Sequence, residues 1–225
     1  MGRKPTLSRS DIMSRLSDAF LLWGYEGVSL SRMADHVGLA KATLYHHFPA
    51  GKAEMGAAVL ALAGQRLQRL VLAPLQASGP AAERLAASFE GVGRYYNAAP
   101  PACVMNMLAT GDGAKLFGAD ILRANTVWRT HLARTIGAWA EEAQSTSTAA
   151  DPVSMTDGPK DAERRMTVPS LAAARFGLHE AACRMAADDI LDRTQGVLVR
   201  CRLLGNRQPL ESEILALTAS VAGDD

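Results

Sequence analysis

Residues 28–52 read VSLSRMADHVGLAKATLYHHFPAGK, and this stretch decides the fold that we expect for the chain. The apolar residues of its first half are Leu30, Met33, Ala34 and Val37. Their spacing predicts a short helix with one buried face. Gly38 follows, and a residue without a Cβ tolerates the positive φ of a sharp turn. A second helix is expected over 40–48, before Pro49. Two short helices joined by a tight turn form a helix-turn-helix, an arrangement used to enter the major groove of DNA.

The second helix of this pair is predicted to have two different faces. At 100° per residue, one side carries Ala40, Leu44, His47 and Phe48. The other side carries Ala42, Thr43, Tyr45 and His46, with Lys41 at its margin. Hydroxyl groups can bond phosphates, and a lysine can reach a base edge. The exposed face therefore favours contact with DNA, although an ordinary helical hairpin with a solvated polar face has the same pattern.

Neighbouring residues extend this predicted DNA surface. Ser29 or Ser31 can cap the first helix, because a side-chain oxygen there satisfies free backbone N–H groups. Lys52 opens the next helix, where its ammonium can meet a phosphate beside such N–H groups. The complete set of predicted DNA-contacting residues is Ser29, Ser31, Arg32, Lys41, Thr43, Tyr45, His46 and Lys52.

These motifs resemble the TetR family of bacterial transcriptional regulators in residue types and spacing. The run TLYHHF at residues 43–48, followed by Lys52, carries most of the resemblance. The upstream runs FLLWGYEGVS at 20–29 and MADHVGL at 33–39 agree with it in order and spacing. Met33 stands where Ile is usual in the family and Ala42 where Gly is common, and Ala42 puts in doubt which bases are contacted.

Two further motifs resemble the LmrA/YxaF-type branch of that family. FPAGK at 48–52 is one residue longer than the loop that is commoner in the family. The run ACVMNMLA at 102–109 is similar in sequence to that branch. The strong resemblance covers about residues 10 to 56, and the remainder is similar in layout. The resemblance implies an all-α protein with an N-terminal three-helix helix-turn-helix domain and a C-terminal helical ligand-binding and dimerisation domain. We expect these domains at 1–52, including an N-terminal arm, and 53–225.

The function implied by the resemblance is that of a ligand-responsive DNA-binding regulator. It would be a homodimeric repressor that releases its operator, a double-stranded DNA, when a small apolar or aromatic effector binds. Two alternatives remain open: a helical small-molecule-binding protein without DNA binding, or a ligand-modifying enzyme that uses Cys103 or His131. No G-x-S-x-G, H-E-x-x-H or dinucleotide motif occurs, so we expect no enzymatic activity, no cofactor and no metal.

Composition agrees with a helical protein of this kind. The chain has 225 residues, 48% hydrophobic but only 5% aromatic, and no alternating β-branched run that would predict strands. Its net charge is only +1, yet residues 1–52 hold seven Lys or Arg against four acids. Three of these cations lie in the first nine residues. They form either a basic arm that lies along DNA or a terminus without a role. Three widely spaced cysteines, no membrane-spanning apolar run and no signal peptide predict a cytoplasmic protein.

The remaining chain is predicted to continue as helices. The first helix is expected over about 10–23, with Gly24 ending it. Later helices are expected over about 52–73, 81–97, 103–110 and 120–143, separated by proline or glycine breaks that include a Gly-rich bend at 111–113. Residues 145–160 are rich in Ser, Thr, Pro and Gly, which predicts a polar, mobile connection.

The last two helices are predicted to pair with their symmetry mates in a homodimer, around residues 188–204 and 209–222. The apolar positions expected there are Ile190, Thr194, Val197, Cys201 and Leu204, followed by Ile214, Leu217 and Val221. Some of these positions are expected to serve the protomer's own core instead. Gly196 would let two backbones approach closely.

A ligand pocket is predicted among the helices after residue 52. Aromatic and Met side chains on inner faces exceed what DNA binding requires, and such residues give broad apolar contact in ligand sites. Asn125 falls within the apolar stripe of the segment 120–143, where a buried amide must find a partner. A satisfied core asparagine is the plainer interpretation of that position. The predicted ligand-binding residues are Phe89, Tyr96, Met107, Asn125, Trp128 and His131.

Overall fold

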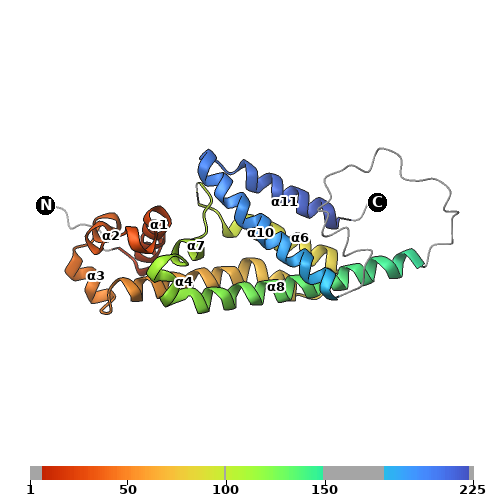
Figure 1. Ribbon diagram of the computed structural model, residues 1–225, viewed down its shortest axis with the longest axis horizontal. Coiled ribbons are helices and arrows are strands. Elements are labelled where there is room, and N and C mark those ends of the chain that lie inside the picture. Colours follow the sequence, from red (N-terminus) through yellow and green to blue (C-terminus); the bar gives the residue numbers. More distant parts are fainter. Residues whose placement is uncertain (1–6, 99, 149–179, 223–225) are drawn as a thin grey trace. The chain divides into compact units, whose positions relative to one another are not determined.

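The computed structural model describes residues 7–98, 100–148 and 180–222 (Figure 1). Those residues form helices joined by turns, with no strand among them, so the all-α prediction is confirmed for this part of the chain. Contacts divide the chain into two units, residues 1–65 with 103–124, and residues 66–102 with 125–225. The first unit thus extends beyond the helix-turn-helix, whereas the domain boundary at residue 52 stays a prediction.

The first unit contains the predicted helix-turn-helix and the helices that support it. Its elements are α1 (Arg9–Gly27), α2 (Leu30–Val37), α3 (Lys41–His47), most of α4 (Lys52–Leu67), α7 (Val104–Leu108) and the first part of α8 (Gly111–Thr148). Its core is formed by apolar side chains that recur at helical spacing, among them Leu16 and Phe20 of α1, Met33 of α2 and Leu44 of α3, each almost fully buried. The three N-terminal helices therefore share one core.

Helix α1 begins and ends differently from the prediction. Ser8 caps its N-terminus, because the Ser8 hydroxyl accepts from the Asp11 N–H while the Asp11 carboxylate accepts from the Ser8 N–H at 3.0 Å. The helix was expected to end at Gly24, and Gly24 does have a non-helical φ of 70°. The chain then completes one more turn to Gly27, so Gly24 is a sharp break within α1.

Helix α8 corrects two predictions. The Gly-rich stretch at 111–113 was expected to be a bend before a helix at 120–143, but α8 begins at Gly111 and continues to Thr148. The reason is a cap that comes from far away in the sequence: the Glu26 carboxylate accepts from the Asp112 N–H at 2.6 Å. Gly111, with φ of 55°, has no Cβ where this carboxylate lies. Residues 145–148 of the predicted connection are helical, and residues 149–160 lie outside the described part.

The described part of the second unit is built mainly from six helical segments. They are η1 (Gln68–Leu72), α5 (Ala73–Gln76), α6 (Ala81–Tyr95), the part of α8 from Asn125, α10 (Glu180–Leu204) and α11 (Gln208–Val221). Figure 1 shows α10 and α11 side by side, and the two helices contact each other as α11 contacts α6. Arg193 of α10 and Glu213 of α11 form a two-pronged ion pair at 2.9 and 3.1 Å. Phe89, Trp128 and Ile136 are among the fully buried side chains.

The helix predicted over 52–73 contains a π-helical turn at its end. Residues Gln68–Leu72 of η1 are π-helical, and α5 continues directly from them through Pro74. Ser88 of α6 donates to the Val71 carbonyl at 2.9 Å, and Gly91 lies so close to the Leu70 carbonyl that a Cβ there would overlap it. Close packing with α6 accounts for this departure, which spacing along one helix cannot reveal.

The apolar positions predicted for the dimer interface are corrected by the burial pattern. Ile190, Thr194, Val197 and Cys201 face the protomer's own core, as do Leu217 and Val221. Leu204 alone among the α10 positions is exposed, at 61%. The basic residues Arg3 and Lys4 of the predicted N-terminal arm lie outside the described part. No described helix is both long and apolar enough to cross a membrane.

Two glycines of α8 allow the packing of the first unit to be tested. A Cβ on Gly113 would overlap the Leu108 carbonyl and lie 3.1 Å from Tyr25 Cβ, whereas one on Gly118 would meet open space. We expect Gly113→Ala to destabilise the protein by about 1–3 kcal/mol, because backbone must move. Gly118→Ala should stabilise it by about 0.4–1 kcal/mol, since alanine favours the helix. Urea unfolding measures both, and equal effects would contradict this packing.

Candidate nucleic-acid interface and pocket

The turn between α2 and α3 is fixed by backbone capping. The Ser29 hydroxyl accepts from the Arg32 N–H at 3.2 Å, so Ser29 is the N-cap of α2. Gly38 has φ of 81° and donates its N–H to the Ala34 carbonyl at 2.9 Å. The Arg15 guanidinium of α1 donates to the Val37 carbonyl at 2.7 Å. These bonds satisfy the end of α2 and hold α3 at a fixed angle to α1 and α2.

Helix α3 presents an exposed polar face, as its sequence predicted. Leu44 is its buried residue, and Phe48 directly after it is 2% exposed. The residues of the opposite face are all exposed: Lys41, Ala42, Thr43, Tyr45 and His46. Tyr45 keeps 44% of its surface exposed although it is a large aromatic residue. A short helix that buries one leucine and exposes cation, hydroxyl and imidazole groups is suited to entering a groove lined by phosphates and base edges.

The predicted contacts on α2 lie on the exposed surface too. Ser29, Ser31 and Arg32 are all exposed, and Ser29 already uses its hydroxyl in the N-cap. The Arg32 guanidinium lies 5.1 Å from the centre of the Trp23 ring of α1, which is a cation–π arrangement. Trp23 also meets the edge of the His36 ring at 5.2 Å. Helical spacing does not reveal this arrangement, because it depends on how α1 packs against α2.

Lys52 occupies a different environment from the one predicted. Its ammonium donates to the Tyr25 carbonyl at 2.8 Å and to the Val28 carbonyl at 3.4 Å. It also lies 4.5 Å from the centre of the Tyr25 ring. The side chain is half-buried rather than extended into solvent. A phosphate contact by Lys52, like the DNA contacts of the other seven residues, stays a prediction.

The helix-turn-helix matches a known family of regulators. Residues 18–59 match the family model described as "Bacterial regulatory proteins, tetR family". The helix-turn-helix segment is therefore similar to that of TetR-family regulators. The chain is also 30% identical over 78 residues to a Bacillus subtilis (strain 168) protein, the "Uncharacterized HTH-type transcriptional regulator YxaF". That match covers 35% of this chain and 41% of YxaF, so the chain matches less than half the length of this relative.

Solved TetR-type structures share the fold over nearly the whole chain. A TetR transcriptional regulator from Legionella pneumophila superposes with a TM-score of 0.64 at 15% identity, covering 97% of this chain and 99% of the other. Mycobacterium smegmatis AmtR superposes with a TM-score of 0.63 at 21% identity, covering 99% and 90%. At such identities the likeness concerns the fold alone, and it includes the helices beyond the TetR-type helix-turn-helix.

The predicted ligand-binding residues are divided between the two units of the chain. Met107 lies in the first unit, while Phe89, Tyr96, Asn125, Trp128 and His131 lie in the second. Phe89, Tyr96 and Trp128 are buried, and Asn125 and His131 are half-buried. The His131 ring nitrogen Nε2 lies 3.0 Å from the Gln76 amide, which in turn accepts from the Gln68 amide at 3.1 Å. Their role as a ligand site stays a prediction.

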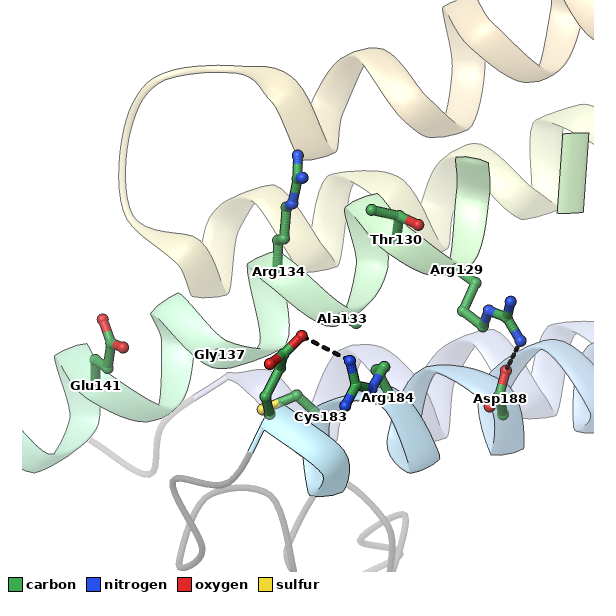
Figure 2. Close-up of a pocket in the computed structure, with 10 residues that line it drawn as sticks. Arg129, Thr130, Ala133, Arg134, Gly137, Glu141, Cys183, Arg184 and Asp188 are labelled. Carbon is green, nitrogen blue, oxygen red and sulfur yellow. Dashed lines mark hydrogen bonds and ion pairs between the residues drawn. The ribbon is translucent and has the colours of Figure 1, made fainter. Parts of the chain in front are cut away.

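A pocket of about 520 Å³ lies between α8 and α10 in the second unit (Figure 2). None of the six predicted ligand residues lines it. Small residues of α8, Ala133 and Gly137, lie opposite Cys183 of α10. Charged side chains surround them, and two pairs are joined: Arg129 with Asp188 at 3.3 Å and Arg184 with Glu180 at 2.6 Å. The pocket is thus polar at its rim, which apolar periodicity along a sequence does not detect.

Cys183 is the one thiol in this pocket lining. Burial raises its pKa, and the nearby carboxylates of Glu141 and Glu180 raise the pKa further by disfavouring a thiolate. The side chain is 7% exposed and carries no disulfide. A protonated, buried thiol of this kind serves as an apolar contact rather than as a nucleophile.

The reactivity of Cys183 tests this environment. We expect iodoacetamide to modify Cys183 more slowly in the native protein than in denaturant at pH 8, because thiolate is the reacting form. Glu141→Gln should lower the pKa of Cys183 and speed the native reaction about two- to threefold, since a repelling carboxylate is removed. Glu83→Gln on exposed α6 surface is the control. Peptide mass spectrometry measures the rates, and an unchanged rate in Glu141→Gln would contradict the proximity of that carboxylate.

Proposed function

We propose that the protein is a DNA-binding transcriptional regulator, most simply a repressor that releases its operator when a small molecule binds. The observation that carries the proposal is the exposed face of α3, which holds Lys41, Thr43, Tyr45 and His46 around a buried Leu44. The TetR-family match at 18–59 covers this helix. In the alternative, a helical small-molecule-binding protein that no longer binds DNA, these side chains would form only a solvated surface.

In this proposal α3 enters the major groove of an operator. Lys41 and His46 reach base edges or phosphates, and the Thr43 and Tyr45 hydroxyls donate to phosphates. Ser29, Ser31 and Arg32 at the start of α2 contact the adjoining backbone. The proposal includes no catalytic step and no cofactor, and it places the protein in the cytoplasm, where bacterial operator DNA is found.

A gel-shift series on the DNA flanking the protein's own gene tests the interface. Tyr45→Phe removes one hydroxyl and should weaken binding to all sequences about two- to tenfold. Lys41→Gln should either reduce the slope of log affinity against log salt by about one unit, as for a lost phosphate contact, or change base preference. Arg94→Gln removes a positive charge from α6 and is the matched control. Unchanged affinity in both α3 variants would rule out this interface.

We further propose that the protein acts as a homodimer through α10 and α11. One helix-turn-helix contacts too few bases for tight specific binding, so two half-sites about one helical turn apart are expected. The residues that remain exposed along one stripe of α10 are Met185, Asp192, Gly196, Val199 and Leu203. Their spacing of seven, four, three and four residues is that of a helix–helix seam. Leu203 is 81% exposed and Leu215 of α11 is 62% exposed, which supports a surface covered by a second copy.

Exposed leucines on different helices allow this dimer to be tested by charge substitution. Leu203→Glu and Leu215→Glu should shift the protein towards monomer at micromolar concentration, because two carboxylates would be buried across a two-fold axis. Leu116→Glu changes an exposed leucine of α8, at 51% exposure, and should leave the dimer intact. Multi-angle light scattering gives the mass of each variant. A monomeric wild-type protein would defeat the proposal.

Two places are proposed for the effector. The first is the part of the predicted set that lies in the second unit, Phe89, Tyr96, Asn125, Trp128 and His131, with the Asn125 amide as the group that orients a mostly apolar or aromatic molecule. Burial of three aromatic members among the helices of the second unit supports this set. Effector binding would release DNA by favouring a dimer state in which the two α3 helices no longer match the half-site spacing.

The second place is the pocket between α8 and α10. Its volume suits a small ligand, and its rim would select a polar molecule rather than an apolar one. Gly137 supports this proposal: a Cβ there would lie 3.8 Å from Cys183 Sγ, an ordinary contact, so alanine would fit. Alanine would also favour the helix by up to about 1 kcal/mol. Packing alone therefore does not require a glycine at position 137, and its missing side chain enlarges the pocket.

A further inference from the structure

Lys52 lies at the first residue of α4, where the helix dipole does not favour a cation. The N-terminal end of a helix carries a partial positive charge, and anions rather than ammonium groups are stabilised there. The Lys52 ammonium instead turns towards α1, where it donates to the Tyr25 carbonyl at 2.8 Å and the Val28 carbonyl at 3.4 Å. The charge of Lys52 is thus unfavourable at the N-terminus of α4 but favourable beside the carbonyl groups of α1.

The two carbonyls that Lys52 binds belong to the end of α1. Val28 is the C-cap of α1, and Tyr25 lies within its last turn, after the break at Gly24. Carbonyl groups at a helix end have no partner within the helix, and a cation near that end is favoured by the dipole. Lys52 therefore serves as a C-terminal cap of α1 that is supplied by α4.

The Tyr25 ring makes this cap a junction of three helices. Its face lies 4.5 Å from the Lys52 ammonium, and its ring meets the edge of the Phe117 ring of α8 at 5.3 Å. Gly56, one turn along α4, lacks the Cβ that would lie 2.6 Å from the Phe117 ring. Tyr25 is only 7% exposed. The half-buried Lys52 ammonium is thus held by two carbonyl oxygens and an aromatic ring, and turning it towards solvent would lose these contacts.

We propose that Lys52 is a positioning residue that orients α2 and α3 on α4, and that it is not a phosphate ligand. The inference rests on the proposed DNA-binding function. Val28 directly precedes Ser29, the N-cap from which α2 begins, so the bond to the Val28 carbonyl acts one residue before the helix-turn-helix. Loss of the bond would free the α1–α2 corner and let the exposed face of α3 turn away from its productive angle.

The first experiment needs no DNA. Thermal unfolding of Lys52→Met should show a melting temperature lower by roughly 3 °C, since two hydrogen bonds and a cation–π contact are lost. Lys52→Gln, which keeps a shorter donor, provides a milder second variant if Lys52→Met does not fold. Lys41→Gln changes an exposed lysine on α3 and should melt as the wild-type protein does. Melting of both Lys52 variants at the wild-type temperature would overturn the proposal.

The second experiment separates positioning from phosphate binding and from simple stability. The probe is a duplex selected by the wild-type protein from a random-sequence library, compared with an unselected duplex at a temperature where every variant is folded. Lys52→Gln should lose about tenfold in affinity for the selected duplex, with the slope of log affinity against log salt unchanged and binding to the unselected duplex nearly unchanged. A merely stabilising residue would not alter this ratio.

A direct phosphate contact by Lys52 gives the opposite pattern. Affinity would then fall equally for both duplexes, and the salt slope would drop by about one unit, as for any lost phosphate contact. That result would overturn the proposal even if the melting temperature fell. If the wild-type protein selects no sequence at all, the proposed DNA-binding function fails instead, and the cap formed by Lys52 is still judged by the melting experiment.

Discussion

The break in α1 at Gly24 is the constraint on which the rest of the first unit depends. A φ of 70° at this position turns the last residues of α1 out of the line of the helix, where they meet other helices instead of their own. Tyr25 then meets Phe117, Glu26 caps the first turn of α8, and Val28 leads into the N-cap of α2. A residue with a Cβ would be strained at this angle, so one glycine lets the end of α1 position both α8 and α2.

Local patterns predicted the parts of the molecule that are local. The α2–α3 pair followed from four apolar positions and Gly38, and the burial of Leu44 with exposure of Tyr45 followed from helical geometry. The start of α8 could not be predicted in this way, because its capping carboxylate, Glu26, lies 86 residues away. Lys52 shows the same limit. A lysine before an apolar helix suggested a solvent-facing charge, and only the folded chain shows the two carbonyls that it binds.

The C-terminal helices show why apolar spacing does not distinguish a core from an interface. Helix α10 carries apolar residues on two faces, and periodicity selected the stripe with Ile190 and Cys201, which packs inside the protomer. The opposite stripe, with Val199 and Leu203, is interrupted by Asp192 and Gly196 and gave a weaker signal. Pockets are harder still, because they are spaces between helices. Gly137 of α8 and Cys183 of α10 both line the pocket between these helices, and they contribute to it by the space that their small side chains leave unfilled.

The Glu26 cap has a consequence for how such sequences diverge. The carboxylate of Glu26 occupies the space that a Cβ on residue 111 would need, so a side chain at 111 and a carboxylate at 26 exclude each other. A lineage that replaces Gly111 first must displace the Glu26 carboxylate and lose the cap, whereas one that shortens residue 26 first removes the overlap and leaves only the strain of the positive φ at position 111. Substitution at the two positions should therefore be correlated, because a glutamate at position 26 adds a second reason for glycine at the start of a helix 86 positions later.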